Sequence, residues 1–224
     1  MSIIVKIVDL EKEYQLGEVT IRALRGVNIK LQKGEFVVVM GPSGSGKTTL
    51  LNLVGALDRP TRGKVYIDGK DLTAMNEREL TTLRRNKIGF LFQFYNLIPV
   101  LTAFENIELP MIIAGVPKKK MQERTQELLE IIGLVERANH RPDELSGGEQ
   151  QRIAIARALA NQPSIVLADE PTGDLDTATG SEVMEVLREM SKREKVTPIV
   201  VTHDPVIAKM ADRILKMRDG KILS

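Results

Sequence analysis

The stretch Gly41-Pro42-Ser43-Gly44-Ser45-Gly46-Lys47-Thr48 decides the fold of this chain. It matches the pattern of a glycine, four further residues and then Gly-Lys-Ser/Thr. The apolar run 36–40 before it predicts a buried strand, and residues 49–57 after it predict a helix. Because a phosphate-binding loop joins a strand to a helix in this order, we interpret the stretch as such a loop and not as an ordinary glycine-rich turn.

Each part of this loop has a place in the predicted chemistry. Glycines let several backbone N–H groups point inward, and the start of a helix adds partial positive charge. The Lys47 ammonium is expected to reach the β- and γ-phosphates of a nucleotide, and the Thr48 hydroxyl to bind Mg²⁺. The candidate cofactor-binding residues here are Gly41, Pro42, Ser43, Gly44, Ser45, Gly46, Lys47, Thr48 and Thr49.

Composition narrows the class of protein. The 224 residues suit one large domain or two small ones. The net charge of +2, from 32 basic and 30 acidic residues, argues against a dedicated nucleic-acid binder. The absence of cysteine excludes disulfides and cysteine-ligated metals. With no apolar run of membrane-spanning length and no signal-peptide pattern at the N-terminus, the sequence predicts a cytosolic protein.

Two kinds of sheet are expected. Residues 3–9, 20–31 and 65–68 predict strands of a partly antiparallel N-terminal region that wraps around the nucleotide core. Continuous apolar runs at 165–168 and 199–202 alternate with predicted helices, which indicates a parallel sheet buried on both faces. The predicted helical segments are 49–57, 117–160, with Gly133 as a stop, and 180–193.

Polar residues follow the predicted buried strands, where ligands gather in parallel sheets. Asp169 follows four apolar residues and is a candidate Mg²⁺ ligand. Next to it, Glu170 is placed to activate water, although an Asp-Glu pair after a strand can also be a helix cap. Gln93 could bind Mg²⁺ or be a structural hydrogen-bonding residue. His203 could contact the γ-phosphate or hold the water and Glu170 in register.

Two aromatic features stay open on the residues alone. Tyr14 is either a half-buried loop aromatic or a platform on which an adenine ring stacks. The apolar segment 94–101, which a proline interrupts, is either core or a docking surface for a partner.

A second anion site is predicted at Leu145-Ser146-Gly147-Gly148-Glu149-Gln150, where a serine and two glycines open a helix. With this motif the chain resembles an ATP-binding-cassette ATPase, the nucleotide-binding subunit of an ABC transporter, over nearly its whole length. The resemblance rests on the phosphate loop, Gln93, this signature, the strand ending at Asp169-Glu170, the stretch Gly173-Asp174-Leu175-Asp176, and His203.

The resemblance implies more than the residues do alone. The chain is expected to be a single α/β domain, residues 1–224, with a mostly parallel P-loop NTPase core. An antiparallel β subdomain at the N-terminus and an inserted α-helical subdomain at roughly 94–160 are expected to complete it. Tyr14 becomes the adenine-stacking residue, Asp176 joins the nucleotide site, and ATP and Mg²⁺ are the cofactors. Two copies are expected to pair head to tail, so that Ser146, Gly147 and Gly148 meet the ATP held by the other copy.

Within this family, the segments 94–99, 101–106 and 146–152 look closest to the lipoprotein-release and macrolide-export type. Phe94 departs from that group, which often has a second glutamine after Gln93. The resemblance implies a separate integral membrane subunit as partner, with this chain peripheral on the cytoplasmic face of the membrane.

The sequence disfavours two other functions. A soluble ABC ATPase acting on nucleic acid or ribosomes usually has a long coiled-coil insertion or two fused cassettes, and neither is evident. A non-catalytic nucleotide-binding regulator is disfavoured by the intact set Lys47, Asp169, Glu170 and His203.

Overall fold

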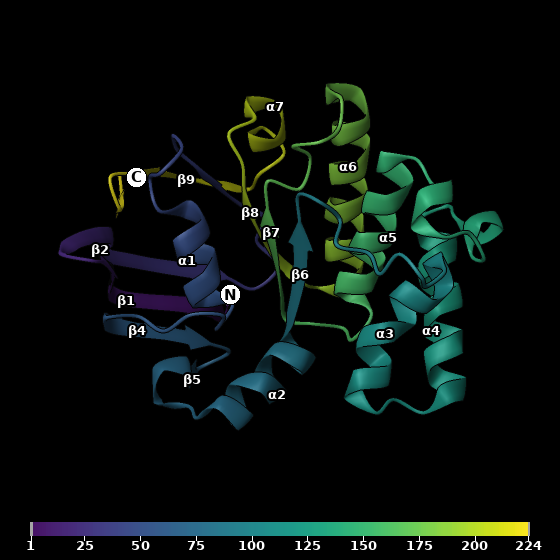
Figure 1. The fold of residues 1–224 in the computed structure, drawn as a ribbon, viewed down its shortest axis with the longest axis horizontal. Helices are drawn as coiled ribbons and strands as arrows, with labels where there is room; N and C mark the ends of the chain where they lie inside the picture. Colours follow the sequence, from purple (N-terminus) through teal and green to yellow (C-terminus); the bar gives the residue numbers. More distant parts are fainter. Residues whose placement is uncertain (1, 224) are drawn as a thin grey trace.

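The computed structural model describes residues 2–223, and their strands form two sheets (Figure 1). One sheet has four strands in the order β2-β1-β4-β5, and the other has six in the order β10-β9-β3-β8-β7-β6. The strands are β1 (Ile3–Leu16), β2 (Val19–Gln32), β3 (Val37–Met40), β4 (Arg62–Ile67), β5 (Lys70–Asp71), β6 (Ile88–Phe92), β7 (Ile165–Asp169), β8 (Thr197–Val201), β9 (Arg213–Arg218) and β10 (Lys221–Ile222). The α-helices are α1 (Lys47–Val54), α2 (Glu77–Lys87), α3 (Ala103–Ala114), α4 (Lys118–Ile131), α5 (Gly147–Leu159), α6 (Thr177–Glu194) and α7 (Pro205–Ala208).

The four-stranded sheet is antiparallel throughout, as predicted for the N-terminal region. Its first two strands are longer than the sequence suggested, since β1 continues to Leu16 through several charged residues. An antiparallel sheet tolerates them because one of its faces meets water. The pairing of β1 with β2 shifts register between Ile7 and Leu10, where Asp9 has a φ of 44°.

The six-stranded sheet is parallel from β9 to β6, and only β10 runs antiparallel to its neighbour. Neighbouring residues of β3 join different cores: Val38 packs in the cluster with α5 and α6, and Val37 and Val39 pack in the cluster with α1 and the antiparallel sheet. The sheet is therefore buried on both faces, as the continuous apolar runs predicted. Because its strands are parallel, β3, β7 and β8 end at the same edge.

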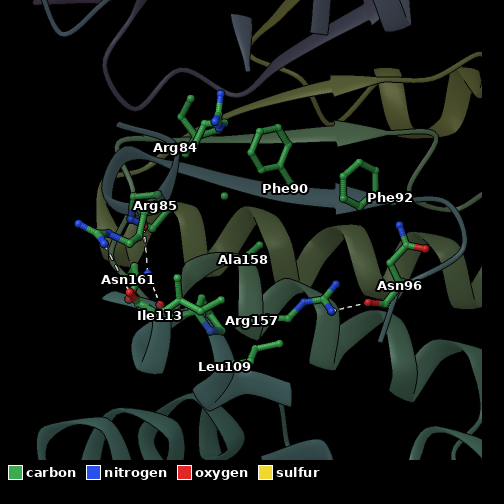
Figure 2. A pocket seen from close by; sticks show the side chains of 14 residues that line it. Arg84, Arg85, Phe90, Phe92, Asn96, Leu109, Ile113, Arg157, Ala158 and Asn161 are labelled. Carbon is green, nitrogen blue, oxygen red and sulfur yellow. Dashed lines mark hydrogen bonds between the residues drawn. The ribbon is translucent and has the colours of Figure 1, made fainter. Parts of the chain in front are cut away.

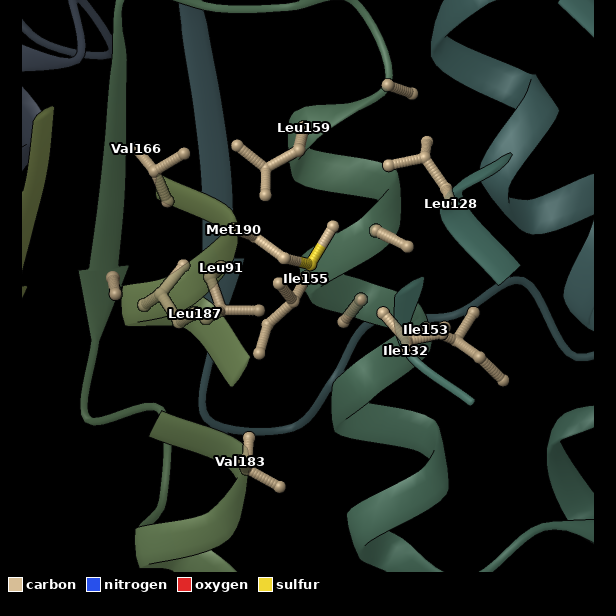
Figure 3. Packing of buried hydrophobic residues seen from close by; sticks show 14 of the residues in the cluster. Leu91, Leu128, Ile132, Ile153, Ile155, Leu159, Val166, Val183, Leu187 and Met190 are labelled. Atoms are coloured by element: carbon tan, nitrogen blue, oxygen red, sulfur yellow. The ribbon is translucent and has the colours of Figure 1, made fainter. Parts of the chain in front are cut away.

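Helices cover this sheet from both sides, with α1 on one side and α5 and α6 on the other (Figure 1). In Figure 3, Ile155 and Leu159 of α5 and Leu187 of α6 lie against Leu91 and Val166 of the strands. All five are fully buried. Each such side chain contributes about 1.5–3 kcal/mol relative to exposure, so α5 is firmly held to the sheet.

The predicted helical segment 117–160 is interrupted, because α4 ends at Ile131. Gly133 takes a φ of 70°, and its N–H and that of Leu134 donate to carbonyls of the last helical turn. This left-handed cap is the stop that the glycine predicted.

Helix α2 was not predicted, and α3 was expected only as part of the helical subdomain at roughly 94–160, without bounds of its own. Each begins with a capping box, Asn76 with Glu79 and Thr102 with Glu105, and this spacing was readable in the sequence. Among residues 2–223, no helix has the length and apolar character needed to cross a membrane.

Candidate active site

The shared edge of β3, β7 and β8 borders a cleft of about 770 Å³. It brings together residues from five separate parts of the sequence. The predicted site residues that line it are Gly41, Pro42, Ser43, Gly44, Gly46, Lys47, Thr48, Thr49, Gln93, Glu170 and His203.

The loop before α1 is built to hold an anion. A Cβ on Gly41 would lie 2.1 Å from the Met217 carbonyl oxygen, and one on Gly46 would lie 2.6 Å from that of Ala23. Gly46 caps α1 with a φ of 102° and offers no side chain to the N–H groups of the first turn. Those groups remain free to bind a ligand, and a group with several anionic oxygens, such as a nucleotide phosphate, fits them.

Lys47 supplies positive charge to the same place. Its side chain is buried, at 8 % exposure, and its Nζ donates to the carbonyl oxygens of Gly41 and Pro42, each at 2.9 Å. Within the described residues 2–223, no carboxylate lies within 4.0 Å of this ammonium. A buried cation with only carbonyl partners is costly unless an anion joins it, which is the role a phosphate group fills.

Oxygen ligands for a cation lie beside the loop. The Thr48 Oγ1 donates to the Asp169 Oδ1 at 3.3 Å. Burial and the neighbouring Glu170 raise the pKa of Asp169, and the Thr48 hydrogen bond opposes them. The described residues hold no cluster of three or more His, Cys, Asp or Glu side chains that could bind a metal alone. Mg²⁺ fits this arrangement, because at nucleotide sites it takes few protein oxygens and fills its shell with phosphate and water.

Glu170 and His203 meet in the cleft although 33 positions separate them. The Glu170 Oε2 lies 3.0 Å from the His203 Nδ1. Glu170 has a φ of 46°, a left-handed conformation that is costly for a residue with a side chain. Its N–H donates to the Val201 carbonyl oxygen at 2.9 Å, which fixes the turn after β7 to the end of β8. The strained turn thus holds a carboxylate at the cleft, where it can accept a proton from water.

Gln93 lines the cleft, yet its amide Nε2 donates to the Asp174 Oδ1 at 3.1 Å. The space for this contact exists because Gly173 has no Cβ, which would lie 2.8 Å from the same Nε2. In this structure Gln93 is therefore bonded to the segment after β7 and not to Thr48 or Asp169.

The signature residues are absent from the lining of the cleft. Ser146 caps α5, where its Oγ accepts from the Glu149 N–H at 3.3 Å and donates to the Glu149 carboxylate at 2.8 Å. Helix α5 lies across the sheet from α1 (Figure 1), and Ser146, Gly147 and Gly148 are at the start of α5. Asp176 likewise caps α6, accepting from the N–H groups of Ala178 and Thr179.

A family model described as "ABC transporter" matches residues 24–173 of the chain. The chain belongs to the ABC transporter family. Its nucleotide is ATP, its activity is ATP hydrolysis, and its fold is that of a P-loop NTPase.

Individual relatives agree with the predicted subgroup. The cassette is 44 % identical over 223 residues to a "Lipoprotein-releasing system ATP-binding protein LolD" of Hyphomonas neptunium, covering 100 % of this chain and 98 % of that protein. It is 49 % identical over 221 residues to a "Macrolide export ATP-binding/permease protein MacB" of Brucella abortus, covering 99 % of this chain but only 34 % of that protein. The resemblance to the lipoprotein-release and macrolide-export type is confirmed.

A solved structure has the same fold. It is described as a dimeric post-hydrolysis state of the ATP-binding cassette MJ0796 bound to ADP and Pi, and MJ0796 comes from Methanocaldococcus jannaschii. The two chains are 48 % identical, with a TM-score of 0.88 over 98 % of this chain and 97 % of that one.

Tyr14 of the cassette does not line the cleft, but it lies at its rim. It pairs across the antiparallel sheet with Ile21, which does line the cleft. Residues directly opposite each other in such a pair project to the same face. The stacking role of Tyr14 remains a prediction.

Sequence reasoning missed Ile21, Arg22 and Ala23, which β2 brings to the cleft of the cassette. Arg22 is a cation within the site, and its Nε lies 3.0 Å from the Glu13 Oε1. No motif marks these residues, because only the folding of the antiparallel sheet over α1 brings β2 next to the phosphate loop.

Proposed function

We propose that this cassette hydrolyses Mg²⁺-bound ATP as one half of a head-to-tail pair and drives a separate membrane-spanning partner. One observation carries the pairing: Lys47 and Glu170 line the cleft, while Ser146, Gly147 and Gly148 stand at the start of α5 and are not among its lining residues. A single copy therefore holds the two halves of an anion site at separate places.

Each residue of the cleft has a separate proposed role in ATP binding and hydrolysis. Lys47 and the free N–H groups of α1 bind the β- and γ-phosphates, and Thr48 and Asp169 hold the cation. Bound Mg²⁺ neutralises phosphate charge. Glu170 accepts the proton of the attacking water, and His203 keeps the Glu170 carboxylate in place through its Nδ1.

A second copy would complete the phosphate shell. Ser146 and Gly148 at the start of α5 would contact the γ-phosphate held by the other copy, and Asp176 at the start of α6 would border the same interface. Support comes from the capping contacts, which hold both segments in fixed positions. The solved MJ0796 cassette, which this chain resembles, is described as dimeric. Because each ATP would touch both copies, ATP binding stabilises the pair.

An apolar pocket of about 340 Å³ is the proposed docking place for the membrane partner (Figure 2). It lies between β6, α2, α3 and α5. Phe90 and Phe92 stack on one side with centroids 6.0 Å apart, and Leu109 and Ile113 of α3 lie on the other. The proposed helical subdomain, roughly 94–160, supplies one wall of this pocket. Nearby, Phe94 and Val100 are 72 % and 74 % exposed, which extends the apolar surface.

The positive charge of this pocket indicates which side chains its partner should carry. Arg84, Arg85 and Arg157 line it, and none of the lining residues among the described 2–223 carries a carboxylate. Their guanidinium groups donate only to neutral oxygens; Arg157, for example, donates to the Tyr95 carbonyl at 2.8 Å. We expect the membrane partner to dock with an apolar segment that carries at least one acidic side chain.

Site-specific crosslinking tests this docking. A photoreactive residue in place of Ile113, which is 61 % exposed, is expected to crosslink to a loop of an integral membrane protein on the cytoplasmic face. Mass spectrometry of membranes from cells that make this cassette identifies the crosslinked peptide. Ile3, 47 % exposed on the antiparallel sheet, is the matched control and should give no such product. Crosslinks to ribosomal protein or nucleic acid would favour the soluble class of ABC ATPase. Crosslinks within the same chain would show that this surface packs against its own protein and does not bind a partner.

A further inference from the structure

Three side chains form one connected cluster around the Tyr14 ring: Lys12 and Tyr14 of β1, and Asp58, which follows α1. The Lys12 Nζ lies 2.7 Å from the Asp58 Oδ1 and 4.8 Å from the centroid of the Tyr14 ring. The Tyr14 hydroxyl donates to the Asp58 Oδ2 at 2.9 Å. Asp58 thus uses one oxygen for each partner, and the lysine also covers one face of the ring.

The cluster is ionised and partly shielded. Lys12 is only 12 % exposed in its side chain, and it also donates to the Arg59 carbonyl oxygen at 2.8 Å. Burial opposes ionisation of Asp58, but the hydrogen bonds from Lys12, the Arg59 N–H and Tyr14 outweigh it and lower the pKa of Asp58. Burial and the bond to Asp58 raise the pKa of Tyr14, which keeps its hydroxyl protonated as a donor.

Asp58 comes from the segment that follows α1, the helix that begins at Lys47. Eight helical residues span about 12 Å, so this helix has the phosphate loop at one end and the anchor of Tyr14 just past the other. Thr61 ties the same segment to β1, because its Oγ1 accepts from the Glu13 N–H at 2.9 Å. The position of Tyr14 relative to the phosphate loop is therefore set through α1.

Tyr14 has the free surface that a ligand needs. It is 38 % exposed, although Lys12 covers one face of its ring. It projects to the same side of the sheet as its pairing partner Ile21, and Ile21 lines the cleft.

We propose that Lys12 and Asp58 are positioning residues for the nucleotide base: they fix the Tyr14 ring at the rim of the cleft so that its uncovered face receives the adenine. This inference rests on the proposed binding of ATP in the cleft. It extends that proposal, because it assigns part of the affinity for the adenine base to Lys12 and Asp58, which belong to no nucleotide-binding motif. A lysine on one face also withdraws electron density from the ring, which favours stacking of a base on the other.

The test compares two ligands that differ in the base. ATP and inorganic tripolyphosphate, each with Mg²⁺, share the phosphate loop, but only ATP has an adenine for Tyr14. We expect Asp58→Ala and Lys12→Met to weaken ATP binding, measured by titration calorimetry, by about two- to tenfold, the scale of one aromatic stack. Affinity for tripolyphosphate should stay at the parent value. Adding either change to Tyr14→Ala should cause no further loss, because all three act through one ring.

Lys6→Met is the matched control. Lys6 is on β1, as Lys12 is, and its Nζ lies 5.5 Å from the ring centroid of Tyr66 on β4. Neither Lys6 nor Tyr66 lines the cleft. This variant should bind both ligands as the parent does. If Asp58→Ala fails to fold, Asp58→Asn keeps an acceptor for the Tyr14 hydroxyl while losing the charge that holds Lys12, and it should show a smaller loss for ATP alone.

Two results would overturn the inference. One is an equal loss for ATP and tripolyphosphate, which would mean that the cluster only supports α1. The other is unchanged ATP affinity in Asp58→Ala, Asp58→Asn and Lys12→Met. A parent protein that binds neither ligand would instead count against the proposed nucleotide cleft itself, so the two failures are distinguishable.

Discussion

Glu170→Gln is expected to bind ATP, to hydrolyse it about 10²–10⁴ times more slowly than the parent, and to dimerise when ATP is added. The change preserves the shape of the side chain but removes the group that accepts a proton from water. It also removes a negative charge beside Asp169 and the bound phosphates. ATP then stays intact in the shared site and keeps two copies together.

Light scattering with and without ATP measures this dimer, and a phosphate-release assay measures the rate. Adding Ser146→Arg is the internal control, because a bulky side chain at the start of α5 would block the shared site and return the variant to a monomer. The pairing model fails if Glu170→Gln stays monomeric at saturating ATP while binding is confirmed by calorimetry.

Lys47→Ala is expected to lose ATP binding and to hydrolyse ATP at least about 10²-fold more slowly. The buried ammonium is held by two carbonyl oxygens next to the anion site, and no other lysine lines the cleft. Without it, the β- and γ-phosphates enter a partly desolvated site that lacks their compensating cation. Removing a buried cation that has only carbonyl partners should not destabilise the empty protein.

Thermal unfolding separates the loss of ATP binding from any change in the stability of the ATP-free protein. The parent should melt at a higher temperature when Mg²⁺ and ATP are added, and Lys47→Ala should show no such rise although its melting temperature without ATP is at least that of the parent. Lys33→Ala, at an exposed lysine, should behave as the parent. Parent-like hydrolysis by Lys47→Ala would show that another residue compensates the phosphate charge.

Local sequence patterns are sufficient to predict the nucleotide core. The loop 41–48 lies between an apolar strand and a helix, and this local order is sufficient to identify a phosphate site. Continuous apolar runs indicated a parallel sheet, and parallel strands end at one edge. The residues after those strands, among them Glu170 and His203, could therefore be predicted to lie together. Helix α2 and the bounds of α3 were missed although both capping boxes were present, because the polar sequence of α2 and the proline in α3 hid the helical period.

The remaining lining of the cleft depends on contacts between residues far apart in the sequence, and no local pattern predicts it. Register shifts in β1 and the fold of the antiparallel sheet bring Ile21, Arg22 and Ala23 to the phosphate loop. Tyr14 reaches Asp58 across 44 positions, which no local pattern records. The same fold carries Ser146 away from the cleft, since α5 packs on the opposite face of the sheet from α1. Such contacts depend on side-chain packing and strand register over long separations, and these are set when the two sheets and their helices assemble.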